Sequence, residues 1–166
     1  MRLDTIDNHA LDDRSESSFQ GVHPDLVRVA RLAHMMMSDD APGLSFIVTE
    51  GIRSVERQRA LVSAGASWTM DSKHIPRAGS DGLEYGHAID LAATVAGVGV
   101  RWDWPLYPRI ARRMKAASSE LGVSITWGGD WDNDGDSSDE RRKDGPHFEL
   151  RDTSLIAADL SRPRLA

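Results

Sequence analysis

Residues 86–94 have the sequence GHAIDLAAT, which is typical of a buried β-strand that begins just after a turn. Gly86 marks the turn, and the apolar residues that follow are interrupted by one acid, Asp90. Because a strand is rigid, a side chain at its end can be held in a fixed position. This stretch therefore predicts both a strand and a well-placed carboxylate.

Three further strands and three helices are predicted on either side of this stretch. Residues 44–51 (LSFIVTEG), 123–129 (VSITWGG) and 146–150 (PHFEL) are rich in β-branched and aromatic residues, and 95–104 (VAGVGVRWDW) is typical of a hairpin. Helices are expected over 24–37, 55–65 and 106–121, with Ser54 as a cap and Gly122 as a terminator. We therefore expect an α+β fold in which helices pack on a small, mainly antiparallel sheet.

The chain is expected to form one domain with two polar ends. Residues 1–20 lack a hydrophobic period and predict a loose N-terminal arm, residues 21–152 a single domain, and residues 153–166 a C-terminal tail. Residues 66–85 are rich in Gly, Ser, Asp and Pro and predict a long loop. Long loops in compact domains are often functional.

The composition excludes several classes of protein. Because the chain has no cysteine, it has no disulfide, thiolate ligand or cysteine nucleophile, and any metal must be bound by His, Asp or Glu. The net charge of −6 argues against nucleic-acid binding, which needs a basic surface. No signal peptide or membrane span is evident, so we expect synthesis in the cytoplasm and no stable membrane association.

Two segments place histidines and acids where loops lead into strands. These are residues 72–74 (SKH) with Asp90, and residues 144–150 (DGPHFEL). A catalytic zinc needs three nitrogen or oxygen ligands and keeps its fourth position open, and His74, Asp90 and His147 meet that count. Two histidines and one carboxylate also suit non-haem iron, so the ligand types alone do not choose the metal.

Two carboxylates are candidates for the general base that would take a proton from a metal-activated water. Asp144 precedes His147 by three residues, across a Gly-Pro turn. Glu149 shares the strand face of His147 and could equally support that histidine as a hydrogen-bond partner. We favour Asp144 as the base.

Six segments together carry a family resemblance. Residues 49–58 (TEGIRSVERQ), 65–74 (GASWTMDSKH), 86–91 (GHAIDL), 100–107 (VRWDWPLY), 127–131 (WGGDW) and 144–150 resemble phage endolysins that act as L-alanyl-D-glutamate peptidases. These belong to a zinc peptidase family that also contains D-alanyl-D-alanine carboxypeptidases and dipeptidases. The likeness covers roughly residues 20–150, and its motifs are specific only in combination.

The resemblance implies roles for individual residues. It implies zinc ligands at His74, Asp90 and His147 and a catalytic acid/base at Asp144. It also implies that Arg53 faces the active site and binds or polarises the substrate, which suits a permanently charged guanidinium. The expected reaction is zinc-dependent hydrolysis of the L-Ala–D-Glu bond in peptidoglycan stem peptides, causing lysis of the bacterial cell.

Further expectations concern the substrate and the setting. Ser72 is expected to orient the loop or a ligand through a hydrogen bond. Trp127 and Trp131 flank the expected cleft, and Trp127 is predicted to contact the substrate. The resemblance also implies a monomeric bacteriophage lysis protein that acts on the cell wall after release and depends on a membrane-disrupting partner to reach it.

The sequence departs from the family pattern between His74 and Gly86. Residues 75–85 (IPRAGSDGLEY) form an insertion that relatives lack, and we expect a surface loop there that shapes the substrate cleft. His87 is the natural substitute ligand, but it lies on the opposite face from Asp90 in a regular strand. We therefore keep His74 as the ligand.

An acidic stretch matches the opening of a calcium-binding loop, with oxygen-bearing residues at alternate positions and Gly135 at the turn. It lacks the usual Glu at position twelve, where Arg141 stands. The alternative is a solvated acidic loop. The candidate calcium ligands are Asp130, Asp132, Asp134 and Asp136.

Two rival functions follow from the same residues. One is a D-alanyl-D-alanine carboxypeptidase on the same fold, in which only the bond that is cut would differ. The other is a non-catalytic module that binds wall peptide or calcium in the same groove. A general base at Asp144 and an open metal position argue against the binding module.

Overall fold

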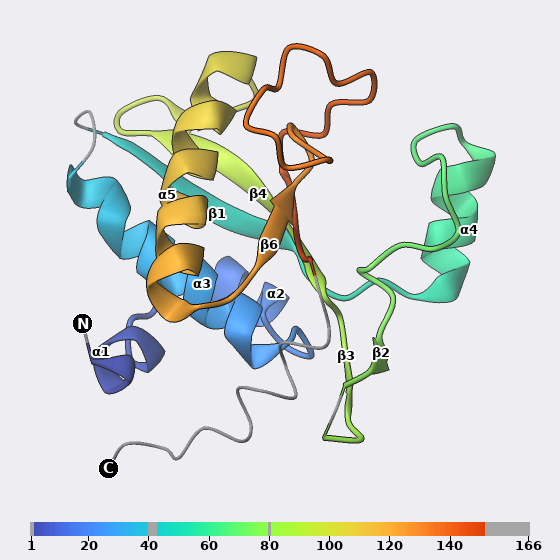
Figure 1. Ribbon diagram of the computed structural model, residues 1–166, viewed down its shortest axis with the longest axis horizontal. Helices are drawn as coiled ribbons and strands as arrows, with labels where there is room; N and C mark the ends of the chain where they lie inside the picture. The colour runs from blue at the N-terminus through green and yellow to red at the C-terminus, as the bar shows by residue number, and fades with distance from the viewer. Residues whose placement is uncertain (1, 40–42, 80, 152–166) are drawn as a thin grey trace.

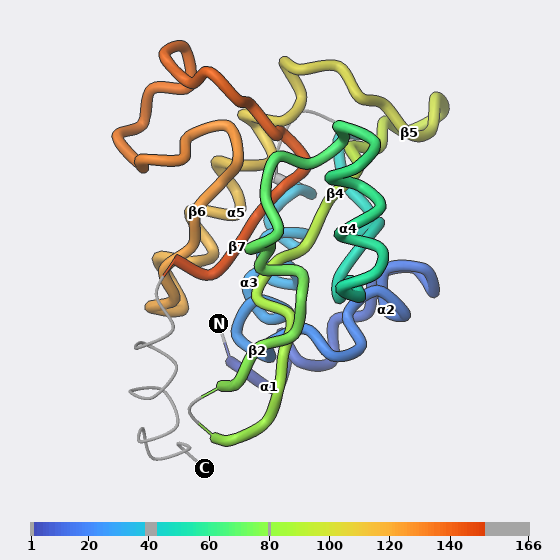
Figure 2. The backbone as a smooth tube through the Cα atoms, turned by 90° about the vertical axis from the view of Figure 1, so that its right-hand side faces the viewer, coloured from blue at the N-terminus to red at the C-terminus, as the bar shows by residue number. Residues whose placement is uncertain are grey.

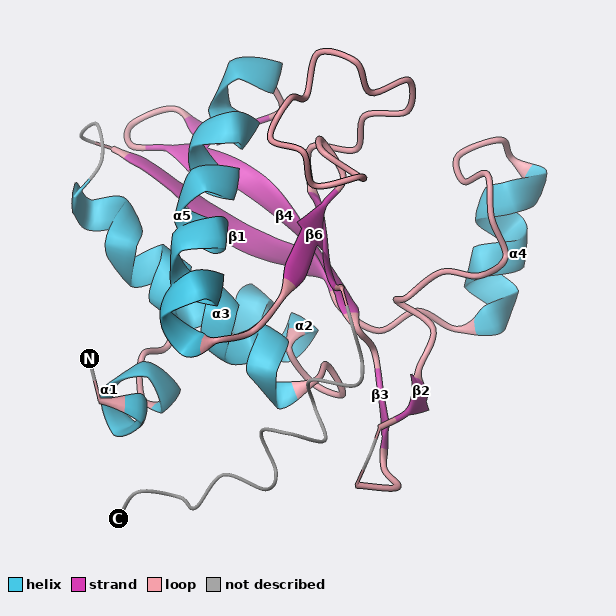
Figure 3. Cartoon of the chain, in the orientation of Figure 1, coloured by secondary structure: helices cyan, strands magenta, loops and turns pink. Residues whose placement is uncertain are grey.

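The computed structural model describes residues 2–39, 43–79 and 81–151, and the predicted tail at 153–166 lies outside them. An antiparallel sheet and the helices packed on it form the body of the fold, as the sequence predicts (Figures 1 and 3). None of the helices in the described part of the chain is long and apolar enough to cross a membrane.

The main sheet has the strand order β1-β4-β7-β6, with every pair antiparallel. Its strands are β1 (Leu44–Glu50), β4 (Ala88–Val95), β7 (His147–Leu150) and β6 (Ile125–Trp127), and the short β5 (Gly99–Arg101) pairs with the far end of β4. The register places Asp90 of β4 directly opposite His147 of β7. Two candidate ligands that are far apart in sequence thereby become neighbours.

Two long helices cover one face of this sheet, α3 (Pro24–Met36) and α5 (Tyr107–Leu121) (Figure 3). They contact each other, and their fully buried Leu26, Leu32, Ile110 and Met114 join strand residues in one hydrophobic core. Short 3₁₀ turns, η1 (Met37–Asp39) and η2 (Trp104–Leu106), follow α3 and precede α5.

The predicted helix ends are confirmed. The Ser54 side chain accepts a hydrogen bond from the amide of Arg57 and caps α4 (Val55–Ser63). Gly122 ends α5 with φ 67°, a left-handed conformation that costs glycine little. In the view of Figure 2, α4 and the loop of residues 130–144 lie on opposite sides of β4 and β7.

The expectation of a loose N-terminal arm is wrong for the described residues. Two short helices, α1 (Leu3–Asp7) and α2 (Asp13–Ser18), form there, and Ile6 and Phe19 are buried in the core. Asp12 caps α2, and the Ser15 hydroxyl accepts a hydrogen bond from the amide of Val48 in β1. The arm is ordered because a few buried anchors hold it, although it has no continuous apolar stripe.

The predicted long loop contains a small hairpin, formed by β2 (Arg77–Ala78) and β3 (Glu84–Tyr85). This hairpin is the described part of the 75–85 insertion, and it projects from the body of the fold (Figure 1).

Candidate metal centre

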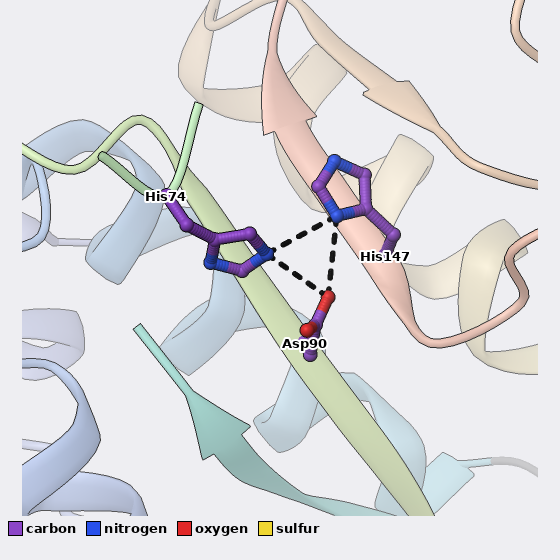
Figure 4. Close-up of side chains that lie close together, drawn as sticks. All are labelled: His74, Asp90 and His147. Atoms are coloured by element: carbon purple, nitrogen blue, oxygen red, sulfur yellow. Dashed lines mark hydrogen bonds and ion pairs between the residues drawn. The ribbon is translucent and has the colours of Figure 1, made fainter. Parts of the chain in front are cut away.

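Three side chains converge at the end of the sheet (Figure 4). The Nε2 atom of His74 lies 3.2 Å from Oδ1 of Asp90 and 3.3 Å from Nδ1 of His147, and that Nδ1 lies 3.2 Å from the same Oδ1. His74 and His147 are 1% and 8% exposed. The sequence-predicted ligands thus form a nearly equilateral triangle that can hold one metal ion.

The backbone fixes each corner of this triangle. Asp90 and His147 are paired across β4 and β7. His74 ends a turn in which the Ser72 hydroxyl accepts a hydrogen bond from the His74 amide, while the His74 carbonyl accepts one from the amide of Arg53. Ser72 therefore shapes the turn that presents His74.

The ring nitrogen of each histidine that points away from the triangle faces an oxygen atom that can only accept a hydrogen bond. Nδ1 of His74 donates to the carbonyl of Gly51 at 2.6 Å, and Nε2 of His147 donates to the Glu149 carboxylate at 3.0 Å. In the neutral rings, the inner nitrogens are then lone-pair acceptors that face the Asp90 carboxylate. Three acceptors that point at one another need a cation between them, which is the arrangement of a metal site.

Electrostatics in the triangle favour positive charge. Burial raises the pKa of Asp90, but hydrogen bonds from His147 and His74 outweigh burial and hold the pKa well below its usual range. For His147, burial lowers the pKa, but its bonds to Asp90 and Glu149 prevail and raise it to about 9. A proton and a metal ion would therefore compete for the Nδ1 atom of His147.

Asp144 lies beside the triangle, in the same cleft. Its amide donates to the Gly128 carbonyl at 2.7 Å, and its carbonyl accepts a hydrogen bond from the amide of His147 at 3.1 Å. Burial and the negative charge of Asp90 raise the pKa of Asp144, although the nearby histidines and Arg53 oppose them. A carboxylate with a raised pKa is suited to accept and return a proton near neutral pH.

Arg53 contacts Oδ2 of Asp90, the oxygen that does not face the two histidines. Its guanidinium donates two bonds to the Glu50 carboxylate, at 3.0 and 2.6 Å, one to Gln58 at 2.7 Å and one to Oδ2 of Asp90 at 3.4 Å. Four of its five N–H groups are thereby engaged by the described residues. Although burial lowers the pKa of Arg53, its bonds to Glu50 raise it, so the charge is permanent.

Glu149 is a hydrogen-bond partner of His147, which is one of the two roles that the sequence allowed. Its Oε2 atom accepts a hydrogen bond from Nε2 of His147, and its Oε1 atom pairs with the Lys73 ammonium at 2.9 Å. Its carboxylate is therefore engaged on the side of His147 away from the metal-facing atoms. Lys73, Glu50, Gln58 and the Gly51 carbonyl were not predicted as site residues, and a backbone carbonyl has no sequence signature.

The centre opens into a cleft of about 1070 Å³ between the loop that follows α4 and the loop of residues 130–144. Trp131 and Trp68 line the cleft, and Trp68 is 51% exposed. Trp127, predicted to contact the substrate, is instead a core residue that is 4% exposed, and its Nε1 donates to the Gly145 carbonyl. Pairing with β7 turns its ring inward, where it stacks with Phe148.

The insertion does not line this cleft among its described residues, which corrects the expected role. His87, the alternative ligand, is fully buried and packs its ring edge-on against His23. It lies on the other face of the strand from Asp90, as the alternation of side chains predicts.

The acidic loop brings three of its four predicted ligands together. Carboxylate oxygens of Asp130, Asp132 and Asp134 lie within 4.8 Å of one another, and Asp136 is not part of that group. Asp130 is buried and forms an ion pair with Lys115. A cation at this site would compete with that ammonium group.

Comparison with known proteins agrees with this geometry. A family model described as phage L-alanyl-D-glutamate peptidase matches residues 8–151. The L-alanyl-D-glutamate peptidase of Escherichia phage T5 is 32% identical over 143 residues, which cover 82% of this chain and 93% of that protein. The peptidase of the same name from Listeria phage A118 is 33% identical over 92 residues, covering 55% of this chain and 28% of that protein.

A solved structure resembles most of this chain. The L-Ala D-Glu endopeptidase ChiX of Serratia marcescens is similar with a TM-score of 0.64 and 41% identity, over 86% of this chain and 91% of that one. The sequence-based resemblance and the α+β fold are thereby confirmed. The chain belongs to the phage L-alanyl-D-glutamate peptidase family.

Proposed function

We propose that this protein hydrolyses the L-Ala–D-Glu bond of peptidoglycan stem peptides with a zinc ion bound by His74, Asp90 and His147. The observation that carries the proposal is the triangle of ligand atoms, in a chain that belongs to this peptidase family. Ligands of a tetrahedral zinc, bonded at about 2.0–2.1 Å, stand about 3.3 Å apart. The observed separations of 3.2 to 3.3 Å match that spacing.

When bound, zinc would lower the pKa of water and polarise the carbonyl of the scissile bond. The remaining work falls to side chains of this chain. Asp144 accepts a proton from the attacking water and returns it to the leaving amine of D-glutamate. Its raised pKa suits both transfers, because a strongly acidic carboxylate would be a poor base and a poor proton carrier.

Arg53 holds the second oxygen of Asp90, and this leaves Oδ1 directed at the metal position. Its one unengaged N–H can donate to the carbonyl oxygen of the substrate as negative charge develops there. Gln58 and Glu50 fix the guanidinium from its other edges. Arg53 therefore combines a positioning role with electrostatic stabilisation.

The setting and regulation of the enzyme stay predictions. The substrate is part of the cell wall, so the enzyme would act there after release from the cell with the help of a membrane-disrupting partner, as a monomer. Calcium binding at Asp130, Asp132 and Asp134 would have to displace the Lys115 ammonium from Asp130. Calorimetric titration with calcium, compared with Asp132→Asn, tests that prediction.

The central experiment is mass spectrometry of muropeptides incubated with metal-free protein, zinc-reconstituted protein and Asp144→Asn. Zinc-reconstituted protein should release a free amine on D-glutamate, and metal-free protein should not. Asp144→Asn should bind zinc but cleave about 10²- to 10⁴-fold more slowly. Asp103→Asn is the matched control, because Asp103 is exposed and pairs with Arg101 outside the cleft. Loss of terminal D-Ala would identify a carboxypeptidase, and absence of any cleavage would favour a binding module.

A further inference from the structure

The cleft contains more basic side chains than the proposed chemistry uses. Most of them are neutralised by acids of the same cleft. Arg53 and Arg57 both bond to Glu50, and Lys73 pairs with Glu149. The two that have no carboxylate partner among the described residues are Arg141 and Arg142.

Arg142 is held in place by aromatic groups. Its guanidinium carbon lies 5.5 Å from the centre of the Trp68 ring, and its carbonyl accepts a hydrogen bond from Nε1 of Trp131 at 2.7 Å. The two indoles meet edge to face with centroids 6.0 Å apart. Stacking on an indole orders a guanidinium without neutralising it, so its N–H groups stay available to an anion.

This arrangement adjoins the metal centre. The Trp131 ring lies 5.4 Å, centre to centre, from the ring of the ligand His147. Arg142 and Trp131 come from one wall of the cleft and Trp68 from the other. Arg142 and the metal-facing residues line the same cleft, so a substrate bound at the metal centre can extend a charged group toward Arg142.

The substrate has a group of the required charge. A glutamate residue has two carboxyl groups, and only one of them can continue the peptide chain. The leaving D-glutamate thus keeps a free carboxylate near the amine that is released. A guanidinium fork matches a carboxylate with two parallel hydrogen bonds.

We propose that Arg142, ordered by Trp68 and Trp131, binds the free carboxylate of the D-glutamate residue and selects substrates in which that group is charged. This inference rests on the proposed function and adds a specificity determinant to it. Arg141 lines the same cleft, but no contact among the described residues orders its side chain. A preorganised cation binds at lower entropic cost than a mobile one.

The test compares two stem peptides that differ at one group, the free carboxylate of D-glutamate or its amide. Wild-type enzyme should cleave the acid with a kcat/KM about tenfold above that of the amide, mainly through KM, as expected for one charge-assisted bond at an exposed site. Arg142→Gln should cleave both peptides equally, and Arg142→Lys should keep most of the preference. Arg112→Gln, an exposed change on α5, should behave as wild type.

Binding gives a second readout that does not depend on turnover. Calorimetry in an Asp144→Asn background should show the same acid-over-amide preference, and adding Arg142→Gln should abolish it. Circular dichroism and zinc content, unchanged from wild type, establish that each variant is folded and loaded.

Three outcomes would overturn the inference. If wild type cleaves the peptides and Arg142→Gln keeps the preference, the inference about Arg142 is wrong while the proposed function stands. If the preference is lost in Arg141→Gln instead, Arg141 binds the carboxylate. If zinc-loaded wild type cleaves neither peptide, the proposed function fails and the inference fails with it.

Discussion

Gly128 is the position at which the smallest change should separate metal binding from catalysis. Its amide donates to the His147 carbonyl, and its own carbonyl accepts the amide of Asp144. A Cβ added at Gly128 would lie 2.3 Å from the carbonyl oxygen of Asp144 and 2.9 Å from its Cβ. To reach ordinary contact, which begins at about 3.4 Å, the Asp144 backbone must retreat by roughly 1.1 Å.

The Asp144 side is the one expected to move in Gly128→Ala. His147 is held in β7 by pairing with β4, and its strand pairs with β6 on the other side, whereas Asp144 lies in a loop. Displacement of a catalytic group by about 1 Å can cost about 100-fold in rate. We therefore expect kcat on muropeptides to fall about 100-fold, zinc stoichiometry to stay at one, and stability to fall by about 1–3 kcal/mol from overpacking.

The control is Gly79→Ala, in a hairpin that contributes no described residue to the cleft. There the nearest atom to an added Cβ is an oxygen at the flexible end of the Asp81 side chain, at 3.0 Å. The kcat of Gly79→Ala should equal that of wild type. Wild-type kcat in zinc-loaded Gly128→Ala would refute the assignment of Asp144, and loss of zinc would refute the claim that β7 is the rigid side.

Four further outcomes are expected. Glu149→Gln removes the charged partner of His147, so competition with a chelator should show zinc affinity about 10- to 100-fold lower. Because the pKa of His147 is raised to about 9 without metal, a proton competes with zinc below that pH, and zinc affinity measured from pH 6.5 to 9 should rise about tenfold per pH unit. Burial lowers the pKa of His87 from 6.5 to about 4, so the contribution of His87 to stability is complete above pH 6.5 and is lost as pH falls to 4. Urea unfolding should show that His87 accounts for about 3 kcal/mol of the stability change between pH 6.5 and pH 4, so the pH dependence of His87→Asn should be weaker by that amount. Trp68→Leu removes the ring under Arg142 and should raise KM a few-fold with kcat unchanged, whereas an unchanged KM would show that the ring does not order Arg142.

Sequence reasoning predicted three side chains that converge in the structure, because each lies in a short motif: Asp90 and His147 in strands, and His74 in the turn that precedes them. It did not find what orients them. The Gly51 carbonyl bonds to His74, Gln58 bonds to Arg53 and Lys73 pairs with Glu149, and these contacts depend on how distant segments are brought together. Such contacts have no local pattern, so only the folded structure reveals them.

The two tryptophans near the cleft illustrate the same limit. Trp127 and Trp131 are four residues apart and both flank the cleft expected from the sequence, from which Trp127 was predicted as the substrate contact. The pairing of β6 with β7 turns Trp127 into the core, and the turn that follows β6 leaves Trp131 in the cleft. The N-terminal helices were missed for a related reason, since Ile6 and Phe19 are buried by tertiary contacts without any helical period.

The hydrogen bonds around the metal centre also explain why one carboxylate is suited to proton transfer. Asp90, Glu50 and Glu149 each contact a basic group, and these contacts lower their pKa values although burial opposes the change. Asp144 has no such ion pair among the described residues, and burial raises its pKa.

Neighbouring acids whose environments push their pKa values apart are a signature of divided roles in catalysis. The three carboxylates that pair with basic groups stay ionised, and they hold the histidines and Arg53 in place. Asp144 is the one of these four whose pKa is raised, so it takes up a proton more readily than the other three. Asp144 is suited to act as the general base because the other three acids have basic partners that lower their pKa values. Pairing Asp144 with a new cation should therefore lower its pKa and slow catalysis even where its position is unchanged.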